Sequence, residues 1–510
     1  MREDWTIEKL GSFISDRGNS IDPRKFPNED FELYSVPSHS DGKPEIIKGE
    51  KIGSSKQFTG DEWVLLSRIN PHLNRSWVIR SNSTYRKIAS SEWVKFPPNK
   101  AIFPEYLGHY LTQAHVRNYM CANVSGVGGS LTRTNKNAIN ELEIILPPLP
   151  EQRAIVAKIE GLFSDLDKGI ADLKKAQEQL KVYRQAVLKK AFEGELTKEW
   201  REQQTDLLAA EELLEQIKVE GQKHYEQQLE DWKQAVNAWE KNGKEGKKPG
   251  KPKFLKEMTS FSQDQKSKLY KLDKTWVWTK SGQIFSYVTS GSRGWAKYYS
   301  DEGGIFIRIT NLNFDTLDLE LTPESIQYVK PPASAEGLRT KVFEGDFLFS
   351  ITGYLGMFAI APYLEEAYVN QHISLARPSK LCNSKFLGYW IIAKTGGHFY
   401  LNKKSKGATK AGLGLDDIIE FPIPLCPIEE QHQIVQEIES RLSVCDQVEE
   451  SITESLEKAQ ALRQSILKKA FEGTLLTEGE VAACKAAPDY EPASVLLERI
   501  KNLKKDKAHV

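Results

Sequence analysis

The sequence predicts a mixed α+β fold with two α/β globular domains separated by a pair of long antiparallel coiled-coil helices, related by a pseudo-twofold internal repeat. Two observations predict this arrangement. A long amphipathic segment occurs twice at an offset of 279 residues, and a stretch with strand composition precedes each copy. The length of 510 residues also exceeds what one ordinary hydrophobic core supports, so at least two domains are expected.

The first globular domain is expected over residues 1–146. Strand composition bounded by turn residues predicts a strand in FELYSVPS at 31–38, and FPEYLGHYLTQAHVRNYM at 103–120 predicts a helix. The whole chain is neutral, with 70 basic and 70 acidic residues. The regions 1–146 and 257–425 each hold 19 Lys and Arg against 17 Asp and Glu, which permits nucleic-acid binding without demanding it.

The first spacer helix is expected over residues 147–197, and its repeat over residues 426–477. Between Glu151 and Leu196, 19 of 46 positions are identical to the second copy without a gap, including all of KKAFEG. Gly194 and Gly473 follow KKAFE and are expected to end the helices. Apolar side chains at every seventh position predict a coiled-coil seam. The seam residues are Ile159, Leu166, Leu173, Leu180 and Val187 in the first helix and Ile438, Cys445, Ile452, Ala459 and Ile466 in the second.

Residues 198–269 are expected to form a polar helical segment followed by a linker. The linker holds seven Lys between 241 and 256, together with Gly and Pro, and is either solvated or in contact with DNA phosphates. The second globular domain is expected over 270–425, with strands within 303–314 and 342–351 and a helix in NSKFLGYWIIAKTGGHFY at 383–400. The tail, 478–510, is expected to hold a short helix.

Composition and motifs exclude several classes of protein. No apolar run approaches the ~20 residues of a membrane span, and the charged start lacks the apolar stretch of a signal peptide. No CxxC pair occurs, and the odd number of cysteines argues against a disulfide framework, which favours a reducing cytoplasm. The cysteines are Cys121, Cys382, Cys426, Cys445 and Cys484.

Catalytic motifs are missing as well. The chain contains no GxxxxGK[ST] loop, no HExxH, no Cys/His cluster with metal-ligand spacing, and no Asn/Asp-Pro-Pro-aromatic motif of amino-group DNA methyltransferases. Three classes remain: a non-catalytic DNA-reading subunit, an enzyme that carries its own recognition domains, and a coiled-coil scaffold without a DNA role. The missing methyltransferase motif disfavours the second class, and the two aromatic-containing globular domains disfavour the third.

At LPPLPEQRAIVAKIE and QAVLKKAFEGEL the chain resembles the specificity subunit of type I restriction-modification systems. PLPEQ at 148–152, IEEQ at 428–431 and the doubled KKAFEG are distinctive in combination, and the resemblance covers nearly the whole chain. The second copy departs from the pattern, because Cys426-Pro427-Ile428 stands where the first copy has Pro-Pro-Leu. The helix after this departure keeps its seven-residue phase.

The resemblance implies a mechanism. Each globular domain is a target-recognition domain that reads one half of a bipartite target in double-stranded DNA, and the helices set the gap and dock two methyltransferase subunits. The chain itself is non-catalytic and holds no cofactor or metal. S-adenosylmethionine, ATP and Mg²⁺ are expected in the partner subunits, which include restriction subunits with translocase activity. The alternative is that the chain is the specificity part of another restriction or methylation enzyme.

Polar loops flanked by glycine predict candidate DNA-binding residues from the chemistry of their side chains. Arg, Asn and Gln suit base edges, and Lys suits phosphates. In the first domain the candidates are Arg17, Lys43, Lys56, Arg68, Asn70, Arg75, Arg133 and Lys136. In the second domain they are Ser292, Arg293, Lys297, Asn311, Asn313, Tyr354, Gln371, His372, Lys403, Lys404, Lys406 and Lys410.

Overall fold

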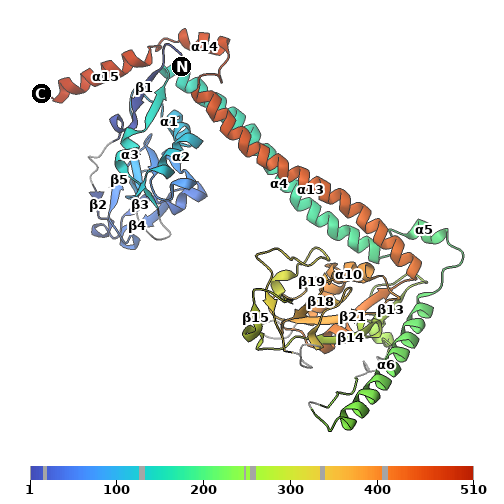
Figure 1. Cartoon of the computed structure of the whole chain (residues 1–510). Coiled ribbons are helices and arrows are strands. Elements are labelled where there is room, and N and C mark those ends of the chain that lie inside the picture. The colour runs from blue at the N-terminus through green and yellow to red at the C-terminus, as the bar shows by residue number, and fades with distance from the viewer. Residues whose placement is uncertain are drawn as a thin grey trace. The chain divides into compact units, whose positions relative to one another are not determined.

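The structure is a computed structural model. It describes residues 2–14, 20–125, 132–245, 248–252, 260–332, 339–404 and 412–508. The chain forms two compact units: the first combines residues 1–175 with residues 451–510, and the second comprises residues 176–450. Each unit holds one globular domain and a part of both long helices (Figure 1).

The two long helices have 44 residues each: α4 (Leu149–Phe192) and α13 (Ile428–Phe471). In the first unit, Ile155 near the start of α4 shares a hydrophobic core with Phe471 at the end of α13. In the second unit the order is reversed, because Phe192 at the end of α4 shares a core with Ile434 near the start of α13. The helices therefore run antiparallel in each unit, as the repeat predicted.

Charged side chains join the two helices within each unit. In the first unit, the Arg463 guanidinium pairs with the Asp167 carboxylate. In the second unit, the Arg184 guanidinium lies 2.5 Å from the Asp446 carboxylate and 3.0 Å from that of Glu449. In each unit the long helices thus combine buried apolar side chains with ion pairs between their exposed edges.

The described residues of the first globular domain form four sheets. The strands are β1 (Thr6–Lys9), β2 (Ser20–Ile21), β3 (Asp30–Tyr34), β4 (Glu45–Lys48), β5 (Lys56–Phe58), β6 (Val64–Ser67), β7 (Ser76–Val78), β8 (Arg86–Ala89), β9 (Trp93–Phe96), β10 (Val124–Ser125), β11 (Arg133–Thr134) and β12 (Glu143–Leu146), and the helices are α1 (Pro104–Leu111), α2 (Ala114–Ala122) and α3 (Lys136–Glu141). The larger sheets have the orders β2-β5-β8-β3-β4 and β7-β6-β9, and β1 pairs with β12. The short pair β10-β11 stands apart from them.

The second globular domain repeats much of this topology. Its elements are β13 (Val277–Lys280), α8 (Ser281–Ile284), β14 (Phe285–Ser290), β15 (Tyr299–Ser300), β16 (Gly304–Ile307), β17 (Tyr328–Val329), β18 (Phe347–Ser350), β19 (Phe358–Ile360), β20 (Ala367–Val369), β21 (Ile373–Pro378), α10 (Ser384–Ile392), α11 (Gly397–Lys403), α12 (Leu415–Glu420) and β22 (Pro422–Leu425). The sheets have the orders β14-β21-β18-β19 and β15-β17-β16-β20, and β13 pairs with β22. In both domains the first strand of the domain thus pairs with the strand that precedes the long helix.

The predicted strands and helices are confirmed, with one difference. Each predicted helix is two helices, α1 and α2 in the first domain and α10 and α11 in the second. Gln113 has an extended backbone between α1 and α2, and its amide donates to the Tyr110 carbonyl at the end of α1. Between α10 and α11, Gly396 packs so closely that an added Cβ would lie 2.7 Å from the Trp390 ring.

Shorter helices follow the two long ones. After α4 come α5 (Lys198–Glu202), α6 (Ala210–Lys241) and α7 (Gln263–Lys266), and after α13 come α14 (Glu478–Lys485) and α15 (Ala493–Ala508). The expected polar helix is α6, and the expected helix of the tail is α15. Gly194 and Gly473, which follow the long helices, have φ angles of +76° and +80°, a conformation that favours glycine.

A buried carboxylate fixes each globular domain to the helix that follows it. In the second unit, Glu430 is fully buried and accepts hydrogen bonds from the Trp276 indole at 2.9 Å, the Thr197 hydroxyl at 2.8 Å and Arg201 Nε at 2.9 Å. In the first unit, the Trp5 indole donates to Glu151 at 3.0 Å. The same Trp-to-Glu hydrogen bond therefore closes both domains.

The glutamine after each buried glutamate holds the start of a domain helix. Gln152 accepts the backbone N–H of Phe103 at 2.8 Å, immediately before α1. Gln431 accepts the backbone N–H of Asn383 at 2.9 Å, immediately before α10. The repeated Glu-Gln pair thus has a structural role, which is to satisfy buried donors where a domain meets a long helix.

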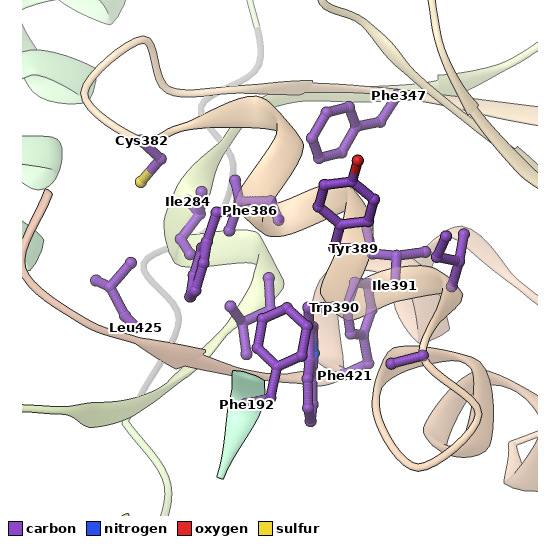
Figure 2. Packing of buried hydrophobic residues seen from close by; sticks show 14 of the residues in the cluster. Phe192, Ile284, Phe347, Cys382, Phe386, Tyr389, Trp390, Ile391, Phe421 and Leu425 are labelled. Carbon is purple, nitrogen blue, oxygen red and sulfur yellow. The ribbon is translucent and has the colours of Figure 1, made fainter. Parts of the chain in front are cut away.

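The phenylalanine of each KKAFEG segment lies in the hydrophobic core of one unit, Phe471 in the first and Phe192 in the second. Phe192 lies with its ring centroid 5.3 Å from that of Phe386 and 5.2 Å from that of Trp390 in the second unit (Figure 2). Phe471 lies 5.1 Å from Tyr106 in the first unit. Aromatic pairs at these distances stabilise a core beyond the area that they bury. Each domain is therefore completed by both long helices.

None of the helices in the described part of the chain is both long and apolar enough to cross a membrane.

Candidate nucleic-acid interface

Loops of the second globular domain gather at one end of the sheet β14-β21-β18-β19. The end of β14 pairs with the start of β21, where Ser290 faces Ser374. The end of β18 pairs with the same start, where Ser350 faces Ile373. Because these strands are antiparallel neighbours, the loop after β14, the loop after β18 and the loop before β21 all leave from one end of the sheet.

Backbone hydrogen bonds tie these loops into a fixed arrangement, which we call the loop frame. The backbone N–H of Ile351 donates to the His372 carbonyl at 2.9 Å, and that of Leu413 donates to the Ile351 carbonyl at 3.0 Å. The His372 N–H donates to the Asn370 side chain at 3.0 Å, which tightens the turn before β21. The frame therefore joins segments that lie far apart in the sequence.

The first globular domain contains the same loop frame. The backbone N–H of Arg68 donates to the Glu92 carbonyl at 3.1 Å, and that of Thr134 donates to the Arg68 carbonyl at 2.8 Å. The Glu92 N–H donates to the Ser90 hydroxyl at 3.3 Å. This hydrogen bond corresponds to the one that the His372 N–H donates to the Asn370 side chain in the second domain. The loop after β6 and the turn before β9 thus take the places of the loop after β18 and the turn before β21.

Neutral polar side chains occupy the frame of the second domain. The Thr352 hydroxyl lies 2.6 Å from His372 Nδ1, and Gln371 Nε2 lies 2.8 Å from His372 Nε2. All three side chains are half-buried. They form a short hydrogen-bonded chain that fixes the Gln371 amide at the end of the sheet.

Exposed side chains lie in the loops at the same end of the sheet as Thr352, Gln371 and His372. Tyr354 is 74% exposed in the loop after β18. Arg293 is exposed in the loop after β14, and the adjacent Ser292 hydroxyl accepts a hydrogen bond from Arg339 at 2.7 Å. Lys297 is exposed beyond this loop, with its ammonium 4.9 Å from the Tyr298 ring. Tyr354 and Arg293 are thus exposed in loops that leave this end of the sheet.

Other candidates of the second domain belong to the scaffold of a loop. Asn311 is buried, and its amide donates to the Glu320 carbonyl at 2.9 Å. Asn313 donates to the Thr316 hydroxyl at 2.8 Å and also accepts backbone N–H groups of the same turn. Both amides therefore form hydrogen bonds within the segment 311–325. Polar loop composition does not distinguish such amides from amides that face a ligand.

The lysines at the end of α11 divide into two kinds. Lys403 is exposed and lies 5.9 Å from the Phe399 ring. Lys404 is paired with Glu420 at 2.9 Å, and this contact lowers the pKa of the Glu420 carboxyl. Lys406 and Lys410 lie outside the described residues.

Charged side chains occupy the frame of the first domain. Glu92 pairs with Arg133 at 3.1 Å and with Arg68 at 3.4 Å. The hydrogen bond to Glu92 raises the pKa of the Arg133 guanidinium. Asn70 follows Arg68 with a φ angle of +50°, and Arg75 is half-buried before β7. The structure thus brings together candidates from residues 68–75 and 133.

The remaining candidates of the first domain are spread over its surface. Lys43 is exposed before β4, and Lys136 is exposed in the first turn of α3. Lys56 Nζ donates to the Ser54 hydroxyl at 2.6 Å, and burial lowers the pKa of Lys56. Arg17 lies outside the described residues. None of these three described positions is supported by the loop frame.

Sequence reasoning missed three residues that support the candidates: Glu92, Thr352 and Arg339. Glu92 forms ion pairs with Arg68 and Arg133. Thr352 is hydrogen-bonded to His372, and Arg339 donates a hydrogen bond to Ser292. Thr352 and His372 are 20 residues apart in the sequence, and Arg339 and Ser292 are 47 residues apart. Only the strand pairing brings them together, so no local pattern in the sequence could have found them.

The seam residues lie at different depths. Ile159, Val187, Ile438, Cys445, Ile452, Ala459 and Ile466 are buried, and Leu166, Leu173 and Leu180 are half-buried. The outermost of them belong to the cores of the globular domains, since Ile159 and Ile466 lie in the core of the first unit and Val187 and Ile438 in that of the second.

Comparisons with known proteins show which chains this one is similar to. The family model described as "Type I restriction modification DNA specificity domain" matches residues 3–180 and 305–458. The Type I restriction enzyme EcoBI specificity subunit of Escherichia coli is 26% identical over 406 residues, which cover 79% of this chain and 71% of that protein. The EcoDI specificity subunit of Escherichia coli is 24% identical over 392 residues, covering 74% and 72%.

One solved structure is similar over most of its length. It is described as "Structural basis underlying complex assembly and conformational transition of the type I R-M system" and has a TM-score of 0.64. The sequence identity is 19%, and the similarity covers 93% of this chain and 99% of that one. At this identity the similarity concerns the fold.

Proposed function

Because this chain belongs to the family of type I restriction modification DNA specificity domains, we propose that it selects the DNA sequence on which a type I restriction-modification complex acts. Each globular domain reads one half of a bipartite target in double-stranded DNA. The paired long helices set the non-specific gap between the two halves. The names of the similar proteins, which are specificity subunits of type I restriction enzymes, support this role.

The observation that carries the proposal is the repeated loop frame. The same backbone arrangement presents polar side chains at one end of a sheet in each domain, but the side chains differ between the two domains. A constant backbone with variable polar side chains suits direct readout, because base edges in the major groove are told apart by the donors and acceptors offered to them. Two such frames in one chain suit a target with two different halves.

The chemistry belongs to partner subunits in this proposal. Two methyltransferase subunits bind the long helices, hold S-adenosylmethionine and methylate adenine, and restriction subunits use ATP and Mg²⁺. The internal repeat supports this stoichiometry, because two similar halves offer two similar binding surfaces. The complex acts in the cytoplasm, where chromosomal DNA is accessible, and this chain transfers no methyl group by itself.

Replacing residues 1–146 with the corresponding domain of another family member tests the proposal. Methylated adenines are mapped across the genome of a strain that carries the chain and its methyltransferase partner. We expect the replacement to change one half of the methylated sequence and to leave the other half and the gap unchanged. A change in both halves, or methyl transfer by the purified chain alone, would contradict the proposal.

A further inference from the structure

The side chain of Gln371 is held in one orientation at the end of the sheet. One N–H of its amide is directed to His372 Nε2, and His372 Nδ1 is directed to the Thr352 hydroxyl. His372 is itself fixed by its backbone N–H, which donates to Asn370. Within the described residues, the second N–H and the carbonyl oxygen of the Gln371 amide have no hydrogen-bond partner. An amide held in this way offers one donor and one acceptor side by side.

We propose that Gln371 reads an adenine in the half-target of the second globular domain and that His372 is its positioning residue. The inference rests on the proposed function and names the base. Adenine presents N7 as an acceptor and the N6 amino group as a donor in the major groove, and a glutamine amide matches both at once. Because the loop frame fixes the amide beforehand, little side-chain entropy is lost on binding.

Exposed cations of the second domain suit contact with the DNA backbone. Arg293 follows β14, whose last residue, Ser290, faces Ser374 three positions after Gln371. Lys403 is exposed at the end of α11. Contacts from Arg and Lys to phosphates fix the position of a protein on the duplex, and contacts to base edges specify the sequence. The loop after β14 thus places one exposed cation, Arg293, at the same end of the sheet as Gln371.

The first domain shows that the amide is not a requirement of the fold. Its frame has the same turn before β9, and Ser91 and Glu92 stand where the second domain has Gln371 and His372. Ser91 has a hydroxyl where Gln371 has an amide, and Glu92 is paired with Arg133. The adenine reading is therefore a property of the second domain, and a Gln371 variant is expected to change only the second half of the target.

Gln371→Glu provides the test. Glutamate keeps the shape of the side chain but replaces its donor with an acceptor, which opposes adenine N7 and suits the cytosine amino group. In the complete complex of the chain with its methyltransferase partner, we expect the affinity for the natural target to fall by about 10- to 100-fold. We expect the change in base preference to be confined to one base pair of the target. Methylation mapping is expected to show the first half and the gap unchanged.

His372→Ala tests the positioning role. We expect relaxed preference at the same base pair, because an amide without its partner adopts several orientations. Gln263→Glu is the matched control, since Gln263 is exposed in α7 and belongs to none of the loops of the frame, and it is expected to keep the natural target. Melting temperatures of the variants show whether each one is folded.

Two outcomes overturn the inference. If Gln371→Glu leaves the methylated sequence and its affinity unchanged, or if it weakens all DNA sequences equally, Gln371 is not a base reader. A failure of the proposed function is distinguishable, because the complex with the unaltered chain would then show no bipartite target.

Discussion

Glu430 gives the sharpest test of how a globular domain is fixed to a long helix. Its carboxylate is fully buried and accepts hydrogen bonds from Trp276, Thr197 and Arg201. The Arg201 side chain is only 11% exposed. Glu430→Ala would leave a nearly buried guanidinium and a buried indole N–H without this acceptor.

The expected loss of stability follows from that geometry. Removing one partner of a buried ion pair typically lowers the free energy of unfolding by about 3–5 kcal/mol. For a unit of this size, each kcal/mol lowers the melting temperature by roughly 2–4 °C. Because Arg201 keeps its ion pair with Asp273 at 3.0 Å, we expect a loss of about 3 kcal/mol, at the lower end of this range, and a downward shift of roughly 6–12 °C in the transition of the second unit.

Differential scanning calorimetry of the full chain measures this shift. Glu429→Ala is the matched control, because Glu429 is the exposed neighbour of Glu430, and it should melt like the natural chain. Glu151→Ala removes the equivalent carboxylate of the first unit and should lower the transition of that unit instead. If Glu430→Ala and Glu429→Ala melt alike, the buried carboxylate does not hold the domain and the reasoning is refuted.

Three further predictions concern other parts of the structure. Phe192→Ala removes a buried ring from the core of the second unit, and we expect a loss of about 3–5 kcal/mol in the free energy of unfolding, measured by urea denaturation. Burial lowers the pKa of His109 below 6.5, so the unfolded chain binds the proton more readily. The first unit should therefore lose stability as pH falls below 6.5, and His109→Leu should reduce this dependence in melting curves recorded from pH 5 to 8. Tyr354→Ala should weaken DNA binding by the complex in a fluorescence anisotropy titration. Tyr363→Ala should not, since Tyr363 is equally exposed at 75% but follows β19 at the opposite end of the sheet; equal effects would contradict the assignment of the loop frame.

The long helices and the repeat could be predicted from the sequence because their pattern is local and periodic. Ile159 and Ile438 recur in phase with other apolar residues, and this period alone requires an apolar stripe. The role of Glu151 could not be predicted in this way. Its partner, Trp5, lies 146 residues away, and nothing in the sequence around either residue shows that they meet.

The candidate site was predicted only in part, for a related reason. Polar composition selected Gln371, which lies in the loop frame, and equally selected Asn311, whose amide is occupied by its own loop. The equivalence of the turns at Glu92 and His372 escaped detection, because the turns share no residue type. Strand register places them, and register is a property of the folded sheet rather than of the segment.

The division of the first unit between the two ends of the chain affects the order of folding during translation. Residues 176–450 form the second unit from one continuous segment, whereas the first unit also requires residues 451–510. The aromatic cluster around Tyr106 must therefore wait for Phe471, which the ribosome adds late. At ~5–20 residues per second the delay lasts on the order of tens of seconds. During that time the N-terminal domain leaves an apolar surface exposed, and chaperones have an opportunity to bind it.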